Sequence, residues 1–214
     1  MGISPKDIDL VAIGGTFQEL ELEIVRRGGK IFISKPEYFT VRCNMSSIGP
    51  CDIALARCDG IYSDGRRPDS VSLAESIIQD LSRRDFTMNA IAKNIETGEL
   101  TDPFNGQEDI KNKLVRCVGN PFDRFNEDRL RVFRAFRFAI TKGLAIEGQT
   151  WLAMREVCQM GNAFAATSHE RIREEINKAF RANTSQTFRM LLDLGLVHVL
   201  DEKGIWLVST TEKR

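Results

Sequence analysis

The apolar residues of this 214-residue chain change their spacing once, and that change limits the folds open to it. Up to about residue 118, short segments of alternating or mixed character are separated by glycine and proline turns. Such segments are typical of short strands with a few helices between them. From Phe125 onward the apolar residues recur every three or four positions, as they do in helices. The sequence therefore predicts an α+β part followed by an all-α part, with a boundary in the GNPFD stretch near residues 119–125.

The individual elements follow from the same patterns together with cap and turn residues. In the first part we expect a helix at 16–28, strands at 30–35, 38–43 and 50–57, a loop at 58–72, a hairpin turn at 96–100, a short helix at 107–113 and a strand at 114–118. In the second part we expect helices at 126–142, at 150–160, from Thr167 with Glu170 completing a capping box, and at 184–196.

Three aspartates are candidate metal ligands. Asp7 and Asp9 are two residues apart in a predicted strand, so both carboxylates project from one face of it. Asp52 would project likewise from a neighbouring strand. Carboxylates grouped in this way suit Mg²⁺ and the phosphoryl or nucleotidyl transfer that Mg²⁺ supports. Aspartates that simply face solvent on a sheet would have the same spacing in the sequence, so the spacing alone leaves both interpretations open.

The segment SRRDFTMNAIA at 82–92 is the second candidate site. Ser82 is expected to cap a short helix, with Asp85 reaching back to it three residues later. Arg83 and Arg84 then lie in the first turn, where a guanidinium suits a phosphate and a carboxylate suits a sugar hydroxyl. The competing interpretation is a capped amphipathic helix whose arginines face solvent.

The predicted helix at 126–142 carries a third group of polar residues. Asp128, Arg131 and Arg134 recur at three-residue steps, and Glu127 precedes Arg131 by four. A carboxylate and a guanidinium on one side of a helix can together match the hydrogen-bonding edge of a base. They can equally form an ordinary ion pair within the helix.

Three phrases in fixed order, RRDFTMNAIA, DPFNGQEDI at 102–110 and EDRLRVFRAFRFA from 127, carry a family resemblance. The chain resembles the bacterial-type (class II) tRNA nucleotidyltransferase and poly(A) polymerase family, the CCA-adding enzymes. This resemblance implies a polymerase-beta-like nucleotidyltransferase head at residues 1–120 and a helical neck that binds RNA at 121–214. In this family a strand and a glycine-rich turn precede the aspartate pair, and a body and tail follow the neck. We expect this chain to lack the strand and the glycine-rich turn, which would expose a sheet edge, and to lack most or all of the body and tail.

The resemblance also assigns roles to residues. It implies that Asp7 and Asp9 hold Mg²⁺, that Asp52 is the third catalytic acid, and that Arg84 touches the triphosphate. Asp85 and Asn89 would lie on the ribose side. The residues implied for base reading and the rest of the nucleotide site are Asp128, Arg131, Arg134 and Arg137. The implied reaction is attack of an RNA 3′-hydroxyl on the α-phosphate of CTP or ATP.

The composition bears on RNA attraction, on the state of the cysteines and on the location of the protein in the cell. Lys plus Arg and Asp plus Glu are 30 each, so the whole-molecule charge gives no attraction to RNA. Residues 111–137 hold a local surplus, with eight basic residues against three acids, and we expect a phosphate-facing patch there. Five cysteines without a CxxC pair favour buried reduced thiols. No apolar run long enough for a membrane is present, and we expect a cytoplasmic protein, with an organelle matrix as the alternative location.

Three functions remain open on the sequence. The first is template-independent addition of CMP and AMP to the 3′ end of tRNA, with poly(A) addition or addition of A alone as its variant. The second is a catalytically silent nucleotide- or RNA-binding fragment, or one half of a split enzyme that needs an N-terminal partner or a second copy. The third is a general helical RNA-binding protein, which leaves the RRDFTMNA segment unexplained.

Overall fold

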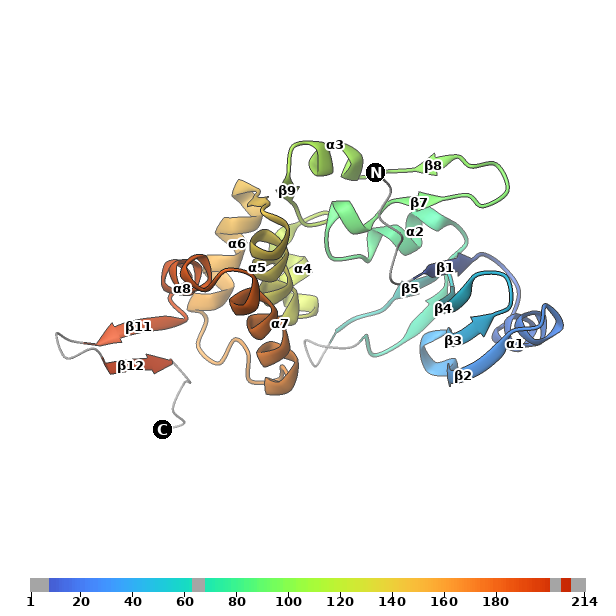
Figure 1. The fold of residues 1–214 in the computed structure, drawn as a ribbon, viewed down its shortest axis with the longest axis horizontal. Helices are drawn as coiled ribbons and strands as arrows, with labels where there is room; N and C mark the ends of the chain where they lie inside the picture. The colour runs from blue at the N-terminus through green and yellow to red at the C-terminus, as the bar shows by residue number, and fades with distance from the viewer. Residues whose placement is uncertain (1–7, 63–67, 201–204, 209–214) are drawn as a thin grey trace. The chain divides into compact units, whose positions relative to one another are not determined.

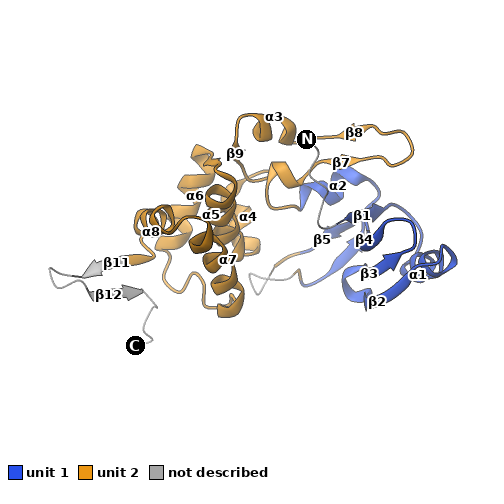
Figure 2. Cartoon of the chain, viewed as in Figure 1, with its two compact units in different colours: residues 1–60, 69–83 blue, residues 61–68, 84–214 orange. Residues whose placement is uncertain are grey.

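The computed structural model describes residues 8–62, 68–200 and 205–208 (Figure 1). Asp7, together with Arg66 and Arg67 of the predicted loop, lies outside these residues. Contacts divide the chain into two compact units, coloured separately in Figure 2. Unit 1 comprises residues 1–60 and 69–83, and unit 2 comprises residues 61–68 and 84–214.

Helices and strands alternate through unit 1, and helices dominate the later part of unit 2. The elements of unit 1 are β1 (Asp9–Ala12), α1 (Phe17–Arg26), β2 (Lys30–Lys35), the 3₁₀ turn η1 (Pro36–Tyr38), β3 (Thr40–Met45), β4 (Gly49–Leu55), β5 (Arg57–Asp59), β6 (Val71–Leu73) and α2 (Ile77–Ser82). Those of unit 2 are η2 (Thr87–Asn89), β7 (Ala92–Lys93), β8 (Leu100–Thr101), α3 (Gly106–Lys111), β9 (Leu114–Val115), α4 (Pro121–Glu127), α5 (Leu130–Lys142), β10 (Ala145–Ile146), α6 (Gly148–Gln159), α7 (His169–Ala182), α8 (Thr184–Asp193), β11 (Val197–Leu200) and β12 (Ile205–Val208).

Unit 1 is built on a four-stranded sheet in the order β1-β4-β3-β2. β1 runs parallel to β4, and the other pairs are antiparallel. Alternate residues of β3 and β4, including Val41, Cys43 and Ile53, are buried in one core with Phe17 and Ile24 of α1. Their alternation confirms the predicted strand periodicity, and the opposite, more polar face carries Arg42 of β3 and Asp52 of β4.

Helix α1 begins with the local signal that the sequence contains. The Thr16 side chain accepts a hydrogen bond from the Glu19 backbone, and the Glu19 carboxylate accepts one from the Thr16 N–H, so a capping box is complete. Gly28, which follows the helix, has a φ of +77°, a conformation that glycine adopts readily. The predicted helix at 16–28 is therefore confirmed.

Unit 2 has a continuous apolar core. Phe86, Cys117, Phe125, Phe136 and Met154 are all almost fully buried in it. Phe86 also forms a β-bridge with Cys117, which ties the RRDF segment to the strand that precedes α4. These contacts join residues 84–118 to the helices, so the two compact units divide near residue 83. The domain limits 1–120 and 121–214 remain a prediction. In the described part of the chain no helix is long and apolar enough to cross a bilayer.

Apart from the segment at 82–92, which is described with the candidate site, four expected elements differ in the structure. The ends of the predicted loop at 58–72 form a hairpin, with Cys58 opposite Ser72. The stretch at 119–125 is a helix start, because the Asn120 side chain accepts from the N–H groups of Phe122 and Asp123. After Phe125 the chain is mostly helical, as predicted, but three short strands occur in the described residues there as well: β10 pairs with β9, and β11 pairs with β12. Of these strands, β9 and β10 have only two residues each, too few to show a period of two.

The fourth difference concerns the predicted single helix at 126–142. It is interrupted at Asp128, whose φ of −141° and ψ of 105° are extended. The Asp128 carboxylate accepts from the Leu130 N–H at 3.0 Å, at the first residue of the new helix α5. The apolar face of α5 and its end at Gly143 agree with the prediction.

Helix α7 also departs from the expected details. Ser168 is its N-cap but makes no side-chain capping bond; its hydroxyl instead donates to Glu170 at 2.6 Å. The capping box predicted with Glu170 is therefore absent from this helix. Its buried residues are Glu175 and Ala179, while Ile172, Ile176 and Phe180 are only partly buried. Glu175 is buried on this face in an ion pair with Arg137, which is described below.

Gly106 gives a test of the packing in unit 2. A Cβ placed on it would lie 2.1 Å from the Thr87 carbonyl oxygen, a backbone atom that cannot move alone. Gly106→Ala is therefore expected to lower the free energy of unfolding by about 2 kcal/mol, measured by urea denaturation. Gly148→Ala is the matched control, because its Cβ meets nothing within 4 Å. Equal stability of the two variants would contradict this packing.

Candidate nucleotidyltransferase site

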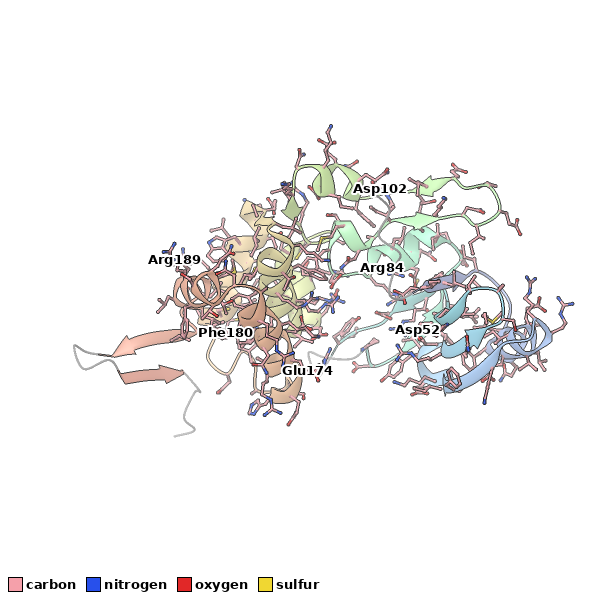
Figure 3. All side chains as sticks on the ribbon, in the orientation of Figure 1. Asp52, Arg84, Asp102, Glu174, Phe180 and Arg189 are labelled. Carbon is pink, nitrogen blue, oxygen red and sulfur yellow. The ribbon has the colours of Figure 1, made fainter. Side chains whose placement is uncertain are left out.

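The polar face of the unit 1 sheet carries a row of three charged residues on adjacent strands. Asp9 of β1 is directly beside Asp52 of β4, and Arg42 of β3 is directly opposite Asp52 on its other side. Figure 3 labels Asp52 on this sheet. Residues that pair directly across strands project from the same face. The register therefore brings two of the three predicted acids together, and the third, Asp7, lies outside the described residues.

Arg42 holds the Asp52 carboxylate in a two-pronged ion pair. Arg42 Nε donates to one carboxylate oxygen and Nη2 to the other, both at 2.7 Å. These hydrogen bonds hold the pKa of the Asp52 carboxyl below its ordinary value. The side chain is thus ionised and already has a cationic partner.

Carboxylate oxygens are the ligands that Mg²⁺ prefers, and Asp9 and Asp52 supply them from adjacent strands. A divalent ion such as Mg²⁺ commonly takes only one or two carboxylates and keeps several waters, so the chemistry of this pair fits a divalent metal ion, although both Asp52 oxygens here accept from Arg42. Within the described ranges no group of three or more histidines, cysteines or acids is close enough to hold a metal.

The RRDF segment differs from the helix expected at 82–92. Ser82 ends α2, and its hydroxyl donates to the Gln79 carbonyl, so it caps no following helix. Only Thr87–Asn89 form a helical turn, after an extended Phe86. The physical reason is that the Phe86 backbone pairs with Cys117, which holds the segment extended there.

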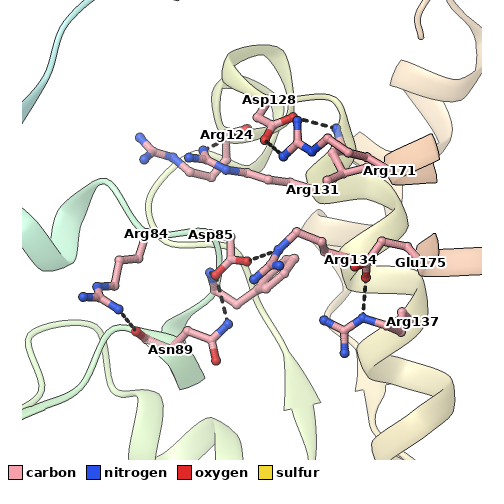
Figure 4. Close-up of polar contacts among 12 residues, drawn as sticks. Arg84, Asp85, Asn89, Arg124, Asp128, Arg131, Arg134, Arg137, Arg171 and Glu175 are labelled. Atoms are coloured by element: carbon pink, nitrogen blue, oxygen red, sulfur yellow. Dashed lines mark hydrogen bonds and ion pairs between the residues drawn. The ribbon is translucent and has the colours of Figure 1, made fainter. Parts of the chain in front are cut away.

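Asp85 is the centre of the polar cluster in unit 2 (Figure 4). Its carboxylate accepts from the Phe86 N–H at 2.9 Å, the Asn89 amide at 3.0 Å and Arg134 Nε at 2.7 Å. Burial alone would raise the pKa of Asp85, but the Arg134 charge and these hydrogen bonds outweigh it and lower the pKa. Arg84 lies beside the cluster, with Nη1 donating to the Asn89 carbonyl at 3.5 Å. The structure thus brings together Arg84, Asp85, Asn89 and Arg134.

Arg134 and Arg137 share one aromatic ring on α5. The Phe138 ring has the Arg137 guanidinium carbon 3.8 Å from its centroid and that of Arg134 5.6 Å away. Arg137 also pairs with the buried Glu175 of α7 (Figure 4). Stacking on a ring and pairing with an acid hold each guanidinium in a fixed plane.

Asp128 and Arg131, the two predicted base-reading residues, have separate partners. Asp128 pairs with Arg171 of α7 at 3.3 Å, and Arg131 is buried and pairs with Glu127. Burial alone would lower the pKa of Arg131, but the Glu127 carboxylate outweighs it and raises the pKa. Arg131 Nη1 also donates to the Arg124 carbonyl at 3.0 Å. Each of the two side chains is therefore held by a partner of opposite charge, Asp128 by Arg171 and Arg131 by Glu127.

A buried network supports the turn that carries Asn89. The Thr87 hydroxyl donates to Asp109 of α3 at 2.7 Å, and both side chains are buried. Arg116 donates to the same Asp109 carboxylate at 3.1 Å. The DPFNGQEDI motif therefore contacts the RRDFTMNAIA motif through the hydrogen bond from Thr87 to Asp109.

Sequence reasoning missed the partners of these residues, namely Arg42, Arg171 and Glu175. The alternation in β3 marks Arg42 as a polar-face residue, but only the register pairs it with Asp52.

The basic patch predicted at 111–137 has acidic partners in the structure. Carboxylates pair with Arg116, Arg124, Arg131, Arg134 and Arg137. Much of the local positive surplus is therefore balanced by acids close in space.

The fold and these clusters define a nucleotidyltransferase head joined to a helical segment. Residues 1–116 match the family described as the Poly A polymerase head domain, and residues 143–202 match the probable RNA and SrmB-binding site of polymerase A. The chain belongs to the poly(A) polymerase and tRNA nucleotidyltransferase family, since the head-domain match covers more than half of it. This confirms the resemblance and the fold class.

Particular relatives are CCA-adding enzymes. The chain is 40% identical over 146 residues to the CCA-adding enzyme of Oceanobacillus iheyensis, which is 68% of this chain and 36% of that protein. It resembles the Bacillus stearothermophilus CCA-adding enzyme in complex with CTP, with a TM-score of 0.66, 33% identity, and coverage of 78% of this chain and 39% of that one. It also resembles the Thermotoga maritima CCA-adding enzyme complexed with tRNA, with a TM-score of 0.73, 26% identity, and coverage of 90% and 43%. The chain thus spans well under half of these relatives.

Proposed function

We propose that the chain is a template-independent nucleotidyltransferase that adds CMP and AMP from CTP and ATP to the 3′ end of tRNA. The observation that carries the proposal is the register that puts Asp9 beside Asp52 on the polar face of a sheet belonging to this family. The relatives solved with CTP and with tRNA support these substrates. We place the activity in the cytoplasm, because the cysteines are free thiols, as is usual in a reducing compartment.

In this reaction the 3′-hydroxyl oxygen of the RNA attacks the α-phosphorus of the nucleotide. The bond from that phosphorus to the bridging oxygen breaks, and pyrophosphate leaves. Asp7, Asp9 and Asp52 are the proposed catalytic acids, with Asp7 and Asp9 as the ligands of Mg²⁺. Bound Mg²⁺ would lower the pKa of the hydroxyl and neutralise charge on the leaving group.

The arginine cluster of unit 2 is proposed to bind the nucleotide. Arg84 contacts the triphosphate, and Asp85 and Asn89 contact the ribose side. Asp128 and Arg131 read the base edge, and Arg134 and Arg137 complete the site. The support is that these guanidiniums are held in place by acids and by the Phe138 ring, so little side-chain freedom is lost on binding.

The direct test is to incubate the purified chain with Mg²⁺, labelled CTP or ATP, and a tRNA that lacks its 3′-terminal CCA. Incorporation that depends on Mg²⁺ and on Asp9 supports the proposal. Product length separates addition of C and A from addition of A alone or of a poly(A) tail. Lack of incorporation by a folded chain that binds CTP would contradict it.

A second candidate is a nucleotide-binding protein without catalysis. The observation in its favour is that Arg42 already occupies both oxygens of Asp52. Equilibrium dialysis with labelled CTP, run beside the incorporation assay, separates the two functions. Binding without incorporation would favour this second candidate.

Arg131 provides a test of base reading. Arg131→Lys keeps the charge but loses the planar fork, so discrimination for CTP over UTP is expected to fall by about tenfold. Metal binding should be unchanged, because Arg131 supplies no oxygen ligand. Incorporation rates with CTP and UTP measure the first effect, and a manganese titration measures the second. The exposed Arg189 of α8 gives the control variant Arg189→Lys; equal loss of discrimination and metal binding in Arg131→Lys would contradict the role.

A further inference from the structure

The row of Asp9, Asp52 and Arg42 places a cation and an acid on opposite sides of one carboxylate. Asp52 is the central member, paired with Asp9 across a parallel ladder and with Arg42 across an antiparallel one. Both oxygens of Asp52 accept from the Arg42 guanidinium at 2.7 Å. An incoming cation therefore meets Asp52 with both oxygens already hydrogen-bonded.

The ion pair lies where such an exchange is feasible. The Arg42 side chain is 59% exposed and that of Asp52 is 32% exposed. Exposed ion pairs contribute little net stability, so a divalent cation can displace the guanidinium without disturbing the sheet. The backbone on both sides stays paired by the β3 and β4 ladder.

We propose that Arg42 competes with the divalent metal for Asp52 and thereby sets the metal concentration that the site requires. The inference rests on the proposed metal-dependent function. In the metal-free state Arg42 occupies Asp52. When the metal binds, the carboxylate turns to the ion, and the guanidinium is released on the same face of the sheet.

The test is a titration of the full chain with Mn²⁺ alone, in which the electron paramagnetic resonance signal reports the free ion. Arg42→Ala is expected to tighten Mn²⁺ binding by about five- to tenfold, because it removes a unit charge a few ångströms from a divalent ion in a solvated site. Arg42→Lys, which keeps the charge, should gain less. Arg26→Ala, which removes an exposed arginine of α1 that is paired with Glu23, should bind as the wild type does.

Asp52→Asn completes the cycle. In the Arg42→Ala background it should remove the gain, since the gain acts through the Asp52 carboxylate. An Arg42→Ala titration within twofold of the wild type, or a gain that survives Asp52→Asn, would overturn the inference. If the wild type binds Mn²⁺ but Asp9→Asn binds it equally well, the metal site itself is wrong and both proposals fail. If Mn²⁺ binding depends on Asp9 but Arg42→Ala leaves it unchanged, only the proposed competition by Arg42 is wrong.

Discussion

Asp9→Asn is expected to reduce nucleotide incorporation by about a thousandfold while the chain remains folded. Metal ligation at the reacting phosphate is worth several kcal/mol, and each 1.36 kcal/mol corresponds to a tenfold rate. Asparagine keeps the shape of the side chain but lacks the negative charge that holds the ion. Asp9 is exposed on β1, so the free energy of unfolding should change by no more than about 0.5 kcal/mol.

The measurement is the initial rate of labelled CMP incorporation, with a urea denaturation curve to show that the sheet is intact. Glu37→Gln is the matched control, because it removes an exposed carboxylate of the same unit away from the charged row. A rate for Asp9→Asn within a few-fold of the control would remove Asp9 from the catalytic group.

Asp85→Asn is expected to have the largest effect on stability, lowering the free energy of unfolding by about 2 to 3 kcal/mol at pH 7. Removing one member of a buried ion pair typically costs about 3 to 5 kcal/mol, and the 34% exposure of the Arg134 side chain reduces this. The asparagine amide cannot accept from Phe86, Asn89 and Arg134 at once, because one of its two polar groups is a donor. Nucleotide binding should be lost with the cluster.

The pH dependence of this loss follows from the lowered pKa of Asp85. An aspartate in the unfolded chain has a pKa near about 3.9, so the stabilisation by the folded carboxylate is fully present above that pH. It is lost as the pH falls through the lower folded-state pKa. The wild type and Asp85→Asn should therefore differ most at neutral pH, and the difference should begin to shrink as the pH falls below about 4.

Urea denaturation at pH 7 and at pH 3.5 measures this convergence. Asp123→Asn serves as the control, because Asp123 is an exposed acid of α4 in the same unit. A difference between wild type and Asp85→Asn that is equal at both pH values would show that the Asp85 charge is not what stabilises unit 2.

The sequence predicted those parts of the fold that depend on near neighbours. The Thr16 and Glu19 capping box, the alternation of β3 and β4, and the end of α5 at Gly143 each depend on residues within a few positions. The predictions failed where a distant partner overrides local preference. Phe86 pairs with Cys117 and prevents a helix at 82–92, and Asp128, where the helix expected at 126–142 is interrupted, pairs with Arg171 of α7.

For the candidate site, too, local sequence and long-range packing determined different features. By itself the sequence determined the residue types, their order, the strand spacing that made Asp9 and Asp52 candidates, and the family phrases that contain Asp85 and Arg131. Only the tertiary structure decided their partners: Arg134 reaches Asp85 from 49 residues away, and Arg42 reaches Asp52 through strand register. The physical reason is that a side chain's charge is fixed by its chemistry, whereas the group that balances it is fixed by long-range packing, which no local pattern records.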